Sequence, residues 1–302
     1  MRTFKGRTAV ITGAGSGLGL EACRIAAREG MNVVLAEVQG DALERASAEI
    51  AGLGAQVLAR RVDVSKAGEV DALAAATRER FGAPHFVFNN AGIAVGGLVW
   101  ENTLEDWNWC LGVNLMGVVH GVRSFVPMML EAAKADPGYE GHVVNTASMA
   151  GLVNMPNQGV YNVSKHAVVA LTETLYQDLG LVTDSIGASV LCPFFVPTGI
   201  FESERNRPDA LRSEAKPTAS QLIGKAMGER AISRGKVSAA MVAQFVFDAM
   251  RERRFYVFSH PNALGAVQMR LEDILTPRNP SDPFAARPDI GAELRAALRS
   301  AG

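Results

Sequence analysis

Short apolar runs alternate with longer amphipathic segments along most of this 302-residue chain. The runs are rich in Val, Ile and Leu, which is typical of strands buried on both faces of a parallel sheet. The expected strands are Thr8–Thr12, Asn32–Glu37, Gln56–Val62, Phe86–Asn89, His142–Thr146, Gly187–Cys192 and Phe255–Phe258. Helical patterns lie between them near residues 18–29, 41–51, 67–81, 104–133, 158–180 and 238–252. This alternation predicts an α/β fold, a doubly wound parallel sheet of about seven strands flanked by helices.

Two regions interrupt the alternation. Residues 193–237 contain four prolines and two apolar patches, and this length between a strand and a helix favours a flap over a substrate. Residues 277–288 are a stiff, proline-rich connector, and Glu293–Arg299 is expected to form a last short helix. We therefore predict one main domain over 1–262, followed by an extension over 263–302. The extension is expected to pack on the same domain or on a neighbouring subunit.

The composition narrows the class of protein. The net charge of −1 gives no reason to expect nucleic acid or an anionic membrane as a partner. Cys23, Cys110 and Cys192 are widely spaced and show neither a metal-binding spacing nor a disulfide framework. We therefore expect no bound metal, and a location in the reducing cytoplasm. The first residues lack the apolar core of a signal peptide, and no uninterrupted apolar stretch reaches membrane-spanning length.

A glycine-rich turn follows the first expected strand. The segment Val10-Ile-Thr-Gly13-Ala-Gly-Ser-Gly17-Leu-Gly19 leads directly into a helical pattern that ends at Gly30. Glycines allow the backbone to approach a pyrophosphate closely, and the helix N-terminus adds N–H donors and the positive end of its dipole. Residues 17–22 fit the relaxed GxGxxA form of a dinucleotide-binding turn. A glycine-rich loop alone is weak evidence, but its position between a strand and a helix favours dinucleotide binding.

A second motif carries acid–base chemistry. Tyr161 and Lys165 stand at i and i+4, so they share one face of an expected helix, and Ser148 lies thirteen residues upstream. A phenol with a pKa near 10 is a poor base at neutral pH. An ammonium at roughly 5 Å, in an effective dielectric near 20, would favour the phenolate by about 3 kcal/mol, or roughly two pKa units. With Ser148 donating a hydrogen bond to the same substrate oxygen, this arrangement suits an alcohol or a ketone.

Together these motifs resemble the short-chain dehydrogenase/reductase family, in its shorter single-domain branch. The TGxxxGxG pattern is present with Thr12 and Gly13, the Asn-Asn-Ala-Gly element is at 89–92, and YxxxK is at 161–165. The resemblance covers residues 5 to 200 in register and continues more loosely to about 260. It implies a Rossmann-like fold, a dehydrogenase domain over 1–262 and a nicotinamide cofactor. It also implies the catalytic residues Asn114, Ser148, Tyr161 and Lys165.

The resemblance also assigns contacts to the cofactor. These are Gly13, Ser16, Gly17, Leu18, Gly19, Glu37, Asp63, Val64, Asn90, Ala91, Gly92, Tyr161, Lys165, Pro193, Val196 and Thr198. Asn114 would interrupt helical bonding and hold a water linked to the lysine, although without the resemblance it would be an ordinary helical residue. Asp63 would contact the adenine, although taken alone it could equally cap the helix that follows.

Glu37 points to NAD as the cofactor. It ends the second strand, where an acidic side chain accepts hydrogen bonds from the adenosine ribose hydroxyls and repels a 2′-phosphate. NADP-preferring relatives carry a basic residue in the glycine turn or just after this strand. The corresponding positions here are Ala14, Ser16 and Val38, none of them basic. NAD is therefore expected over NADP.

The segment after the sixth strand departs from the family pattern. Pro-Gly-x-Val-x-Thr is present as Pro193, Val196 and Thr198, but Phe194 replaces the glycine, which puts the local backbone angles in question. The change also brings a bulky ring close to the reacting centre. Apolar side chains that could extend the lining are Met149, Leu152, Met155, Phe195 and Phe201, although each is also a plausible core residue. We expect a bulky apolar or aromatic substrate.

The sequence therefore predicts an NAD-dependent oxidoreductase that interconverts a secondary alcohol and a ketone. One alternative is an NADP-dependent carbonyl reductase of the same fold, and another is a regulator that binds NAD without turnover. An epimerase or dehydratase is disfavoured because such relatives generally carry a longer substrate domain. A small-molecule substrate and no nucleic-acid or membrane partner are expected. A homodimer or homotetramer formed through helices 104–133 and 158–180 is expected in the cytoplasm.

Overall fold

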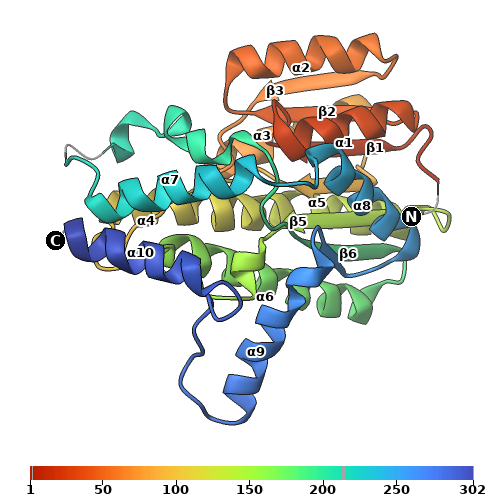
Figure 1. Ribbon diagram of the computed structural model, residues 1–302. Coiled ribbons are helices and arrows are strands. Elements are labelled where there is room, and N and C mark those ends of the chain that lie inside the picture. Colours follow the sequence, from red (N-terminus) through yellow and green to blue (C-terminus); the bar gives the residue numbers. More distant parts are fainter. Residues whose placement is uncertain (2, 213–214, 302) are drawn as a thin grey trace.

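The computed structural model describes residues 1, 3–212 and 215–301 (Figure 1). Residues 213 and 214 of the predicted flap, and residue 302 of the predicted extension, lie outside the described residues. The described chain forms a seven-stranded sheet in the order β3-β2-β1-β4-β5-β6-β7, and every neighbouring pair of strands is parallel. The predicted α/β fold with a doubly wound parallel sheet is confirmed.

The strands lie where the apolar runs are. Their bounds are β1 Thr8–Thr12, β2 Asn32–Glu37, β3 Val57–Arg61, β4 Phe86–Asn89, β5 Gly141–Thr146, β6 Ile186–Cys192 and β7 Tyr256–Phe258. The main helices are α1 Gly17–Arg28, α2 Gly40–Gly52, α3 Ala67–Phe81, α4 Leu104–Leu111, α5 Gly117–Ala135, α6 Gly159–Val182, α7 Ala219–Ser233, α8 Ala239–Glu252, α9 Leu264–Leu275 and α10 Pro288–Ala301. The predicted strand bounds are within one residue of these.

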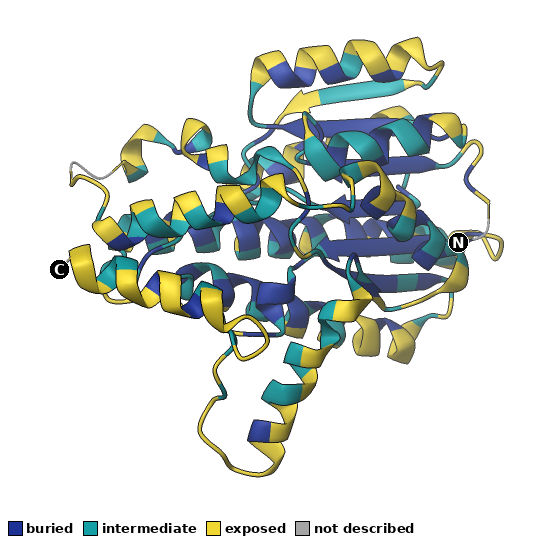
Figure 2. Cartoon of the chain, in the orientation of Figure 1, coloured by how far each residue is buried: buried dark blue, intermediate teal, exposed yellow. Residues whose placement is uncertain are grey.

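Two hydrophobic cores cover the two faces of the sheet. Alternate residues of β1 point to opposite sides, because successive side chains in a strand alternate between faces. Ile11 packs with α1 and α8, whereas Val10 packs with α3, α5 and α6. Both faces of the sheet are therefore covered, and the central strands are dark blue, and so buried, in Figure 2, whereas the edge strand β3 is partly exposed. This burial explains why the strands read as continuous apolar runs rather than as alternating ones.

The helix from Leu104 to Ala135 is long and apolar enough to cross a membrane, judged only by length and composition. It consists of α4, a π-helical turn at Gly112–Met116 and α5. Half of the most apolar 18-residue stretch of this helix is buried inside the protein. A core helix that packs beside a buried sheet has the same properties, so this segment is weak evidence for a membrane span.

Three helices depart from the sequence-based expectation. The flap contains a regular helix, α7, and the extension contains a second unforeseen helix, α9, which projects from the body together with the loop after it (Figure 1). The last helix, α10, starts at Pro288 rather than Glu293 and is longer than predicted. Proline is favoured at a first helical position because a backbone N–H, which proline lacks, would have no partner within the helix there. Helix α10 lies against α7 of the same chain, where Arg230 donates two hydrogen bonds to Glu293.

Candidate active site

A cavity of about 910 Å³ lies at the carboxyl ends of the central strands. Its wall includes Gly13 after β1, Asn90 after β4, Ser148 after β5 and Pro193 after β6. The strand order reverses direction between β1 and β4, and ligands of open α/β sheets bind at such a switch point. The fold therefore brings together motifs that are far apart in the sequence.

The glycine-rich turn is packed so closely that side chains are excluded. Gly13 and Gly17 have φ angles of 64° and 53°, which favour glycine. A Cβ on Gly19 would lie 2.1 Å from the Gly13 carbonyl oxygen, so only glycine fits there. Ser16, at the N-cap of α1, makes no side-chain cap hydrogen bond, and Ser16, Gly17 and Leu18 all line the cavity. The N-terminal N–H groups of α1 thus face the cavity, as a bound pyrophosphate requires.

Thr12 joins the glycine turn to the segment that follows β4. Its Oγ1 accepts hydrogen bonds from the backbone N–H groups of Asn90, at 2.9 Å, and Ala91, at 3.0 Å. The Asn90 amide nitrogen donates in return to the Thr12 carbonyl oxygen at 3.0 Å. Asn90, Ala91 and Gly92 line the cavity, and Gly92 lies close to the catalytic candidates because a Cβ there would be 3.5 Å from Lys165 Nζ.

Glu37 and Asp63 lie at another part of the same cavity wall. Glu37 is buried, and its carboxylate accepts hydrogen bonds from the backbone N–H groups of Gly15, Val38 and Gln39 at 2.9 to 3.1 Å. These contacts fix a negative charge at the end of β2. Asp63 accepts hydrogen bonds from the backbone N–H and the hydroxyl of Ser65 in the turn before α3, but it does not cap that helix, whose N-cap is Lys66. Asp63 and Val64 line the cavity.

Ser148, Tyr161 and Lys165 meet at the cavity wall. Lys165 Nζ lies 5.6 Å from the centre of the Tyr161 ring and donates a hydrogen bond to the Thr146 carbonyl oxygen at 3.0 Å. Ser148 Oγ accepts from the Ala150 N–H at 3.1 Å and donates to the Pro193 carbonyl oxygen at 3.4 Å. The hydroxyl, the phenol and the ammonium that the sequence predicts to act together are therefore adjacent.

The electrostatics of this cluster differ from the sequence-based expectation in one respect. Burial raises the pKa of Tyr161 to about 12, although the hydrogen bond with Ser148 opposes the rise. The expected lowering of the phenol pKa by the ammonium is therefore wrong for the protein alone. Lys165 is 2% exposed, and its burial lowers its own pKa to about 8, because removal from water disfavours the charged form. The net effect holds the proton on the phenol at neutral pH.

Asn114 lies in the π-helical turn, where a helix gains one residue and local bonding changes. Its side chain is fully buried and accepts a hydrogen bond from the Ile93 N–H at 2.9 Å. It also donates to the Ile93 carbonyl oxygen and to Ser164 Oγ, both at 3.0 Å. Asn114 and Gly19 are the two predicted site residues that do not line the cavity. Asn114 instead supports the segment that carries Gly92.

The segment after β6 closes the cavity near Ser148. The cavity is lined here by Pro193, Val196 and Thr198. The Thr198 methyl group lies so close to Gly17 that a Cβ on Gly17 would be 3.3 Å from it. Phe194 is not among the described residues with a positive φ angle. The presence of Phe instead of the family's glycine therefore does not strain the backbone at this position. Its backbone N–H donates to Ser259 Oγ at 2.9 Å.

The structure separates the apolar candidates into two groups. Met155, Phe195 and Phe201 line the cavity together with Phe194. Met149 and Leu152 do not line it. They pack instead into the hydrophobic core beneath α6. The flap therefore provides two of the predicted apolar residues of the lining, Phe195 and Phe201, and the segment before α6 provides Met155.

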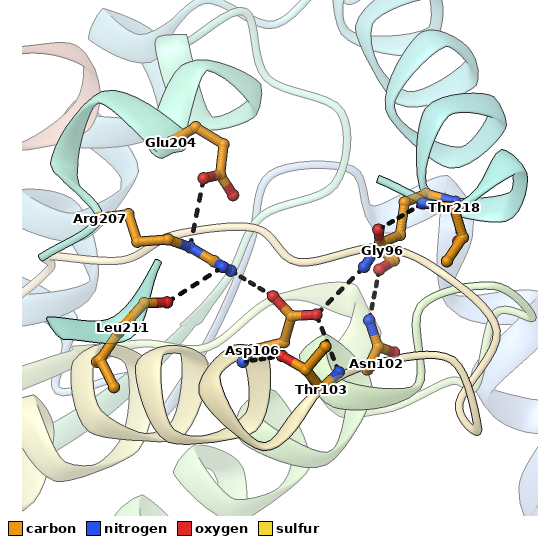
Figure 3. Close-up of polar contacts among 9 residues, drawn as sticks. Gly96, Asn102, Thr103, Asp106, Glu204, Arg207, Leu211 and Thr218 are labelled. Atoms are coloured by element: carbon orange, nitrogen blue, oxygen red, sulfur yellow. Dashed lines mark hydrogen bonds and ion pairs between the residues drawn. The ribbon is translucent and has the colours of Figure 1, made fainter. Parts of the chain in front are cut away.

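The sequence did not predict one group of cavity residues, which lies where α4 meets the flap; we call this part of the lining the far wall. Asp106 on α4 contacts Arg207 of the flap there (Figure 3). Trp109 on α4 and Gln221 of the flap also belong to this group, because Trp109 stacks with Arg207 and Gln221 donates to Asp106. The acid and the guanidinium are 101 residues apart and belong to no local motif. The capping box formed by Thr103 and Asp106 was the one local signal available, and it indicates a helix start rather than a ligand site. Within the described residues, no group of three or more acidic, His or Cys side chains is placed to hold a metal.

Comparison with known proteins places the chain among oxidoreductases. A family model described as short chain dehydrogenase matches residues 7–209. The CLA biosynthesis dehydrogenase/reductase of Lactiplantibacillus plantarum is 33% identical over 279 residues, which cover 91% of this chain and 96% of that protein. The 1-deoxy-11-beta-hydroxypentalenate dehydrogenase of Streptomyces exfoliatus is 35% identical over 270 residues, or 89% of this chain and 88% of the relative.

A solved structure extends this similarity to the cofactor. The chain is 50% identical to a short chain dehydrogenase/reductase from Burkholderia phymatum that was crystallised in complex with NAD. The match has a TM-score of 0.91 and covers 94% of this chain and all of the other. The similarity therefore extends over nearly the whole chain.

Proposed function

The chain belongs to the short-chain dehydrogenase/reductase family, and we propose that it is an NAD-dependent oxidoreductase that interconverts a secondary alcohol and a ketone. The observation that carries the proposal is the meeting of Ser148, Tyr161 and Lys165 on the wall of the cavity that also holds the glycine turn. One cavity thus combines a place for a dinucleotide with a group that exchanges protons.

The residues present fit a nicotinamide dinucleotide. The open N-terminus of α1 suits the pyrophosphate, and Glu37 suits the adenosine ribose. We propose that Lys165 bonds the ribose of the nicotinamide and that Thr198 bonds its carboxamide. When bound in this cavity, a nicotinamide dinucleotide supplies the acceptor or the donor of a hydride.

The protein's own residues would handle the proton and the substrate oxygen. We infer that Ser148 Oγ donates a hydrogen bond to that oxygen and holds it beside the Tyr161 hydroxyl. In oxidation, the hydroxyl proton of the alcohol passes to the Tyr161 phenolate, and the carbon that bears the hydroxyl loses a hydride, which a bound nicotinamide dinucleotide would accept, so that the C–O single bond becomes a carbonyl. In reduction, the Tyr161 phenol gives its proton to the carbonyl oxygen. Lys165 provides positive charge that stabilises the phenolate during the exchange.

A fairly bulky apolar or aromatic alcohol is the proposed substrate. Phe194, Phe195 and Phe201 of the flap, together with Met155 before α6, provide apolar surface in the cavity. The Streptomyces relative, 35% identical, is named for a hydroxylated substrate, 1-deoxy-11-beta-hydroxypentalenate. The test is a panel of aliphatic, aryl and polycyclic secondary alcohols with NAD, followed by the absorbance of the reduced nicotinamide. Turnover only with NADP and ketones would favour the carbonyl reductase, and binding of NAD without turnover of any compound would favour the regulator.

Replacement of Glu37 by Gln is expected to change the cofactor preference. The wild type should use NAD with a higher kcat/KM than NADP, since a fixed carboxylate at the end of β2 repels a 2′-phosphate. Glu37→Gln keeps the shape but removes the charge, so the ratio of the two kcat/KM values should move toward NADP by about tenfold. Asp41→Asn is the control, because Asp41 lies nearby on α2 but is exposed and paired with Arg45. A ratio that moves equally in both variants would contradict a local role for Glu37.

The protein is also proposed to be a cytoplasmic homodimer or homotetramer, assembled through the helix 104–135 and α6. Apolar side chains are exposed on these elements: Met116 is 39% exposed, Val163 48% and Leu181 83%. Burial of such surface between copies would remove it from water. Light scattering should therefore report a mass of two or four chains, whereas a single 32.1 kDa species would contradict the proposal.

A further inference from the structure

A buried pair of opposite charges joins the flap to the start of α4, outside the groups that handle the proton. Asp106 is 5% exposed and Arg207 is 8% exposed, and their side chains are in direct contact (Figure 3). Arg207 lies in the flap between two 3-10 turns, Gly199–Asn206 and Asp209–Leu211. Both residues line the substrate cavity, so the ion pair forms part of its far wall.

The Asp106 carboxylate accepts hydrogen bonds from three segments. One oxygen accepts from the Arg207 guanidinium, and the other accepts from the Thr103 N–H at 3.1 Å and from Gln221 Nε2 at 3.2 Å. The Asp106 N–H in turn donates to Thr103 Oγ1, which completes the capping box of α4. A carboxylate with these three partners is occupied in holding the structure together and is not free to act as an acid or a metal ligand.

Arg207 is held as firmly as its partner. Its guanidinium carbon lies 4.4 Å from the centre of a Trp109 ring, a distance typical of a cation stacked on an aromatic face. Nη1 donates to the Leu211 carbonyl oxygen at 3.4 Å, and Nε lies 3.3 Å from the Glu204 carboxylate. A buried ion pair adds little net stability, but the loss of one partner is unfavourable because the other charge stays buried. The pair therefore favours one position of the flap strongly over the alternatives.

A second group of contacts joins the start of α7, in the flap, to the segment that precedes α4. Ser220, at the start of α7, donates to Glu101 at 2.7 Å and accepts from the Leu98 N–H at 3.0 Å. The Asn157 amide donates to the Ser220 carbonyl oxygen at 2.9 Å. Asn157 has a positive φ of 63° and lies four residues before Tyr161. The flap is thus held across the cavity at Arg207 and at Ser220.

The geometry points to Asp106 and Arg207 as positioning residues that hold the flap over the substrate cavity and so determine substrate affinity. This inference rests on the proposed function, because it concerns the same cavity. When only a fraction of molecules has the flap in place, the apparent affinity for substrate falls by that fraction. The glycine turn and Glu37 lie on other elements, so affinity for the dinucleotide should depend much less on the pair.

Arg207→Met tests the inference, because it removes the charge and the fork of donors but keeps an apolar chain beside Trp109. The KM for the alcohol should rise by about tenfold or more. The kcat and the Kd for NAD should both change by less than about threefold, as expected when uniform substrate binding is lost. Arg207→Lys, which keeps the charge without the planar fork, should restore part of the KM. Arg78→Met is the matched control, because Arg78 pairs with Glu131 in an exposed position between α3 and α5.

A readout without turnover separates this inference from the proposed function. Trypsin should cleave the flap of Arg207→Met faster than that of the wild type at exposed sites such as Arg212, both with and without NAD. If the wild type oxidises no alcohol but the variant flap is cleaved faster, the proposed function fails while the role of the pair in holding the flap stands. Unchanged KM in Arg207→Met, or equal cleavage of the flap in the wild type and the variant, would overturn the inference. Arg207→Lys gives the same comparison if Arg207→Met does not fold.

Discussion

Replacement of Tyr161 by Phe is expected to lower kcat by about two to four orders of magnitude, the usual contribution of a positioned acid or base. The substitution removes one oxygen atom, which is the group proposed to exchange the proton, and keeps the ring beside Lys165. The Kd for NAD should stay within about threefold of the wild-type value, because the glycine turn and Glu37 are unchanged. Stopped-flow or steady-state rates, together with calorimetric binding of NAD, measure the two effects.

Tyr176→Phe provides the matched control for this substitution. Tyr176 lies on the same helix, α6, but it is 45% exposed and its ring packs against Phe255 rather than in the cavity. Its kcat should equal that of the wild type. Equal kcat values for Tyr161→Phe and Tyr176→Phe would remove the assignment of Tyr161 as the proton-exchanging group. Loss of NAD binding in Tyr161→Phe would instead indicate a structural role.

The pKa of Tyr161 also predicts how the rate varies with pH. Burial raises this pKa to about 12 in the protein alone, so the phenol that donates a proton to a ketone predominates at neutral pH. Oxidation needs the phenolate, whose fraction rises about tenfold for each pH unit below the pKa. Oxidation should therefore accelerate as the pH rises, while reduction should slow only near the pKa. Because Ser148 opposes the rise in pKa, Ser148→Ala should move the oxidative profile to higher pH.

The sequence was sufficient to predict the sheet and the catalytic cluster because both depend on local patterns. Buried parallel strands appear as apolar runs, and Tyr161 and Lys165 are brought together by one helical turn. The glycine turn is equally local, since Gly13 and Gly19 touch within a single strand-turn-helix unit. These features need no knowledge of the tertiary structure.

Helices α7 and α9 could not be predicted because neither buries an apolar stripe. The buried residues of α7 are Ser220 and Gly228, and a Cβ on Gly228 would lie 2.2 Å from the Phe201 ring. Close contact through glycine leaves no hydrophobic periodicity for the sequence to show. In α9 the buried residue is Asp273, which accepts hydrogen bonds from Ser281. Leu264 and Val267 at the start of α9 pack against the core while partly buried, but the rest of the helix projects from the body.

The Asp106–Arg207 pair was missed for a different reason, since its two charges are distant in the sequence and each resembles an ordinary surface residue. Arginine and aspartate are mostly exposed in proteins, so the sequence alone predicts that both side chains lie on the surface without pairing with each other. Only the folding of the flap onto α4 shows that they neutralise each other. The substrate wall is therefore the part of the site that depends most on tertiary structure, in contrast to the dinucleotide turn.

Replacement of Lys165 by Met is expected to abolish turnover and yet stabilise the protein at neutral pH. Burial lowers the pKa of Lys165 from 10.5 to about 8, which corresponds to an unfavourable contribution of about 3 kcal/mol when the amine is charged. Met removes the charge and fills similar space, while the lost hydrogen bond to Thr146 costs about 1 kcal/mol. The free energy of unfolding at pH 7 should therefore rise by about 2 kcal/mol.

The pH dependence of this gain identifies its cause. Between pH 8 and pH 10.5 the unfolded state binds more protons at Lys165 than the folded state, so wild-type stability rises with pH across this window. The advantage of Lys165→Met should thus be full below pH 8 and lost by pH 10.5. Urea unfolding at several pH values measures it, with Lys134→Met as the control because Lys134 is exposed near the end of α5. The prediction is contradicted if Lys165→Met is less stable than the wild type at pH 7. It is also contradicted if the gain in the free energy of unfolding does not fall as the pH rises, because burial of the charged Lys165 would then not destabilise the protein. The expected result would instead mean that the family's lysine is kept for proton exchange and cofactor binding, because the fold alone is more stable without it.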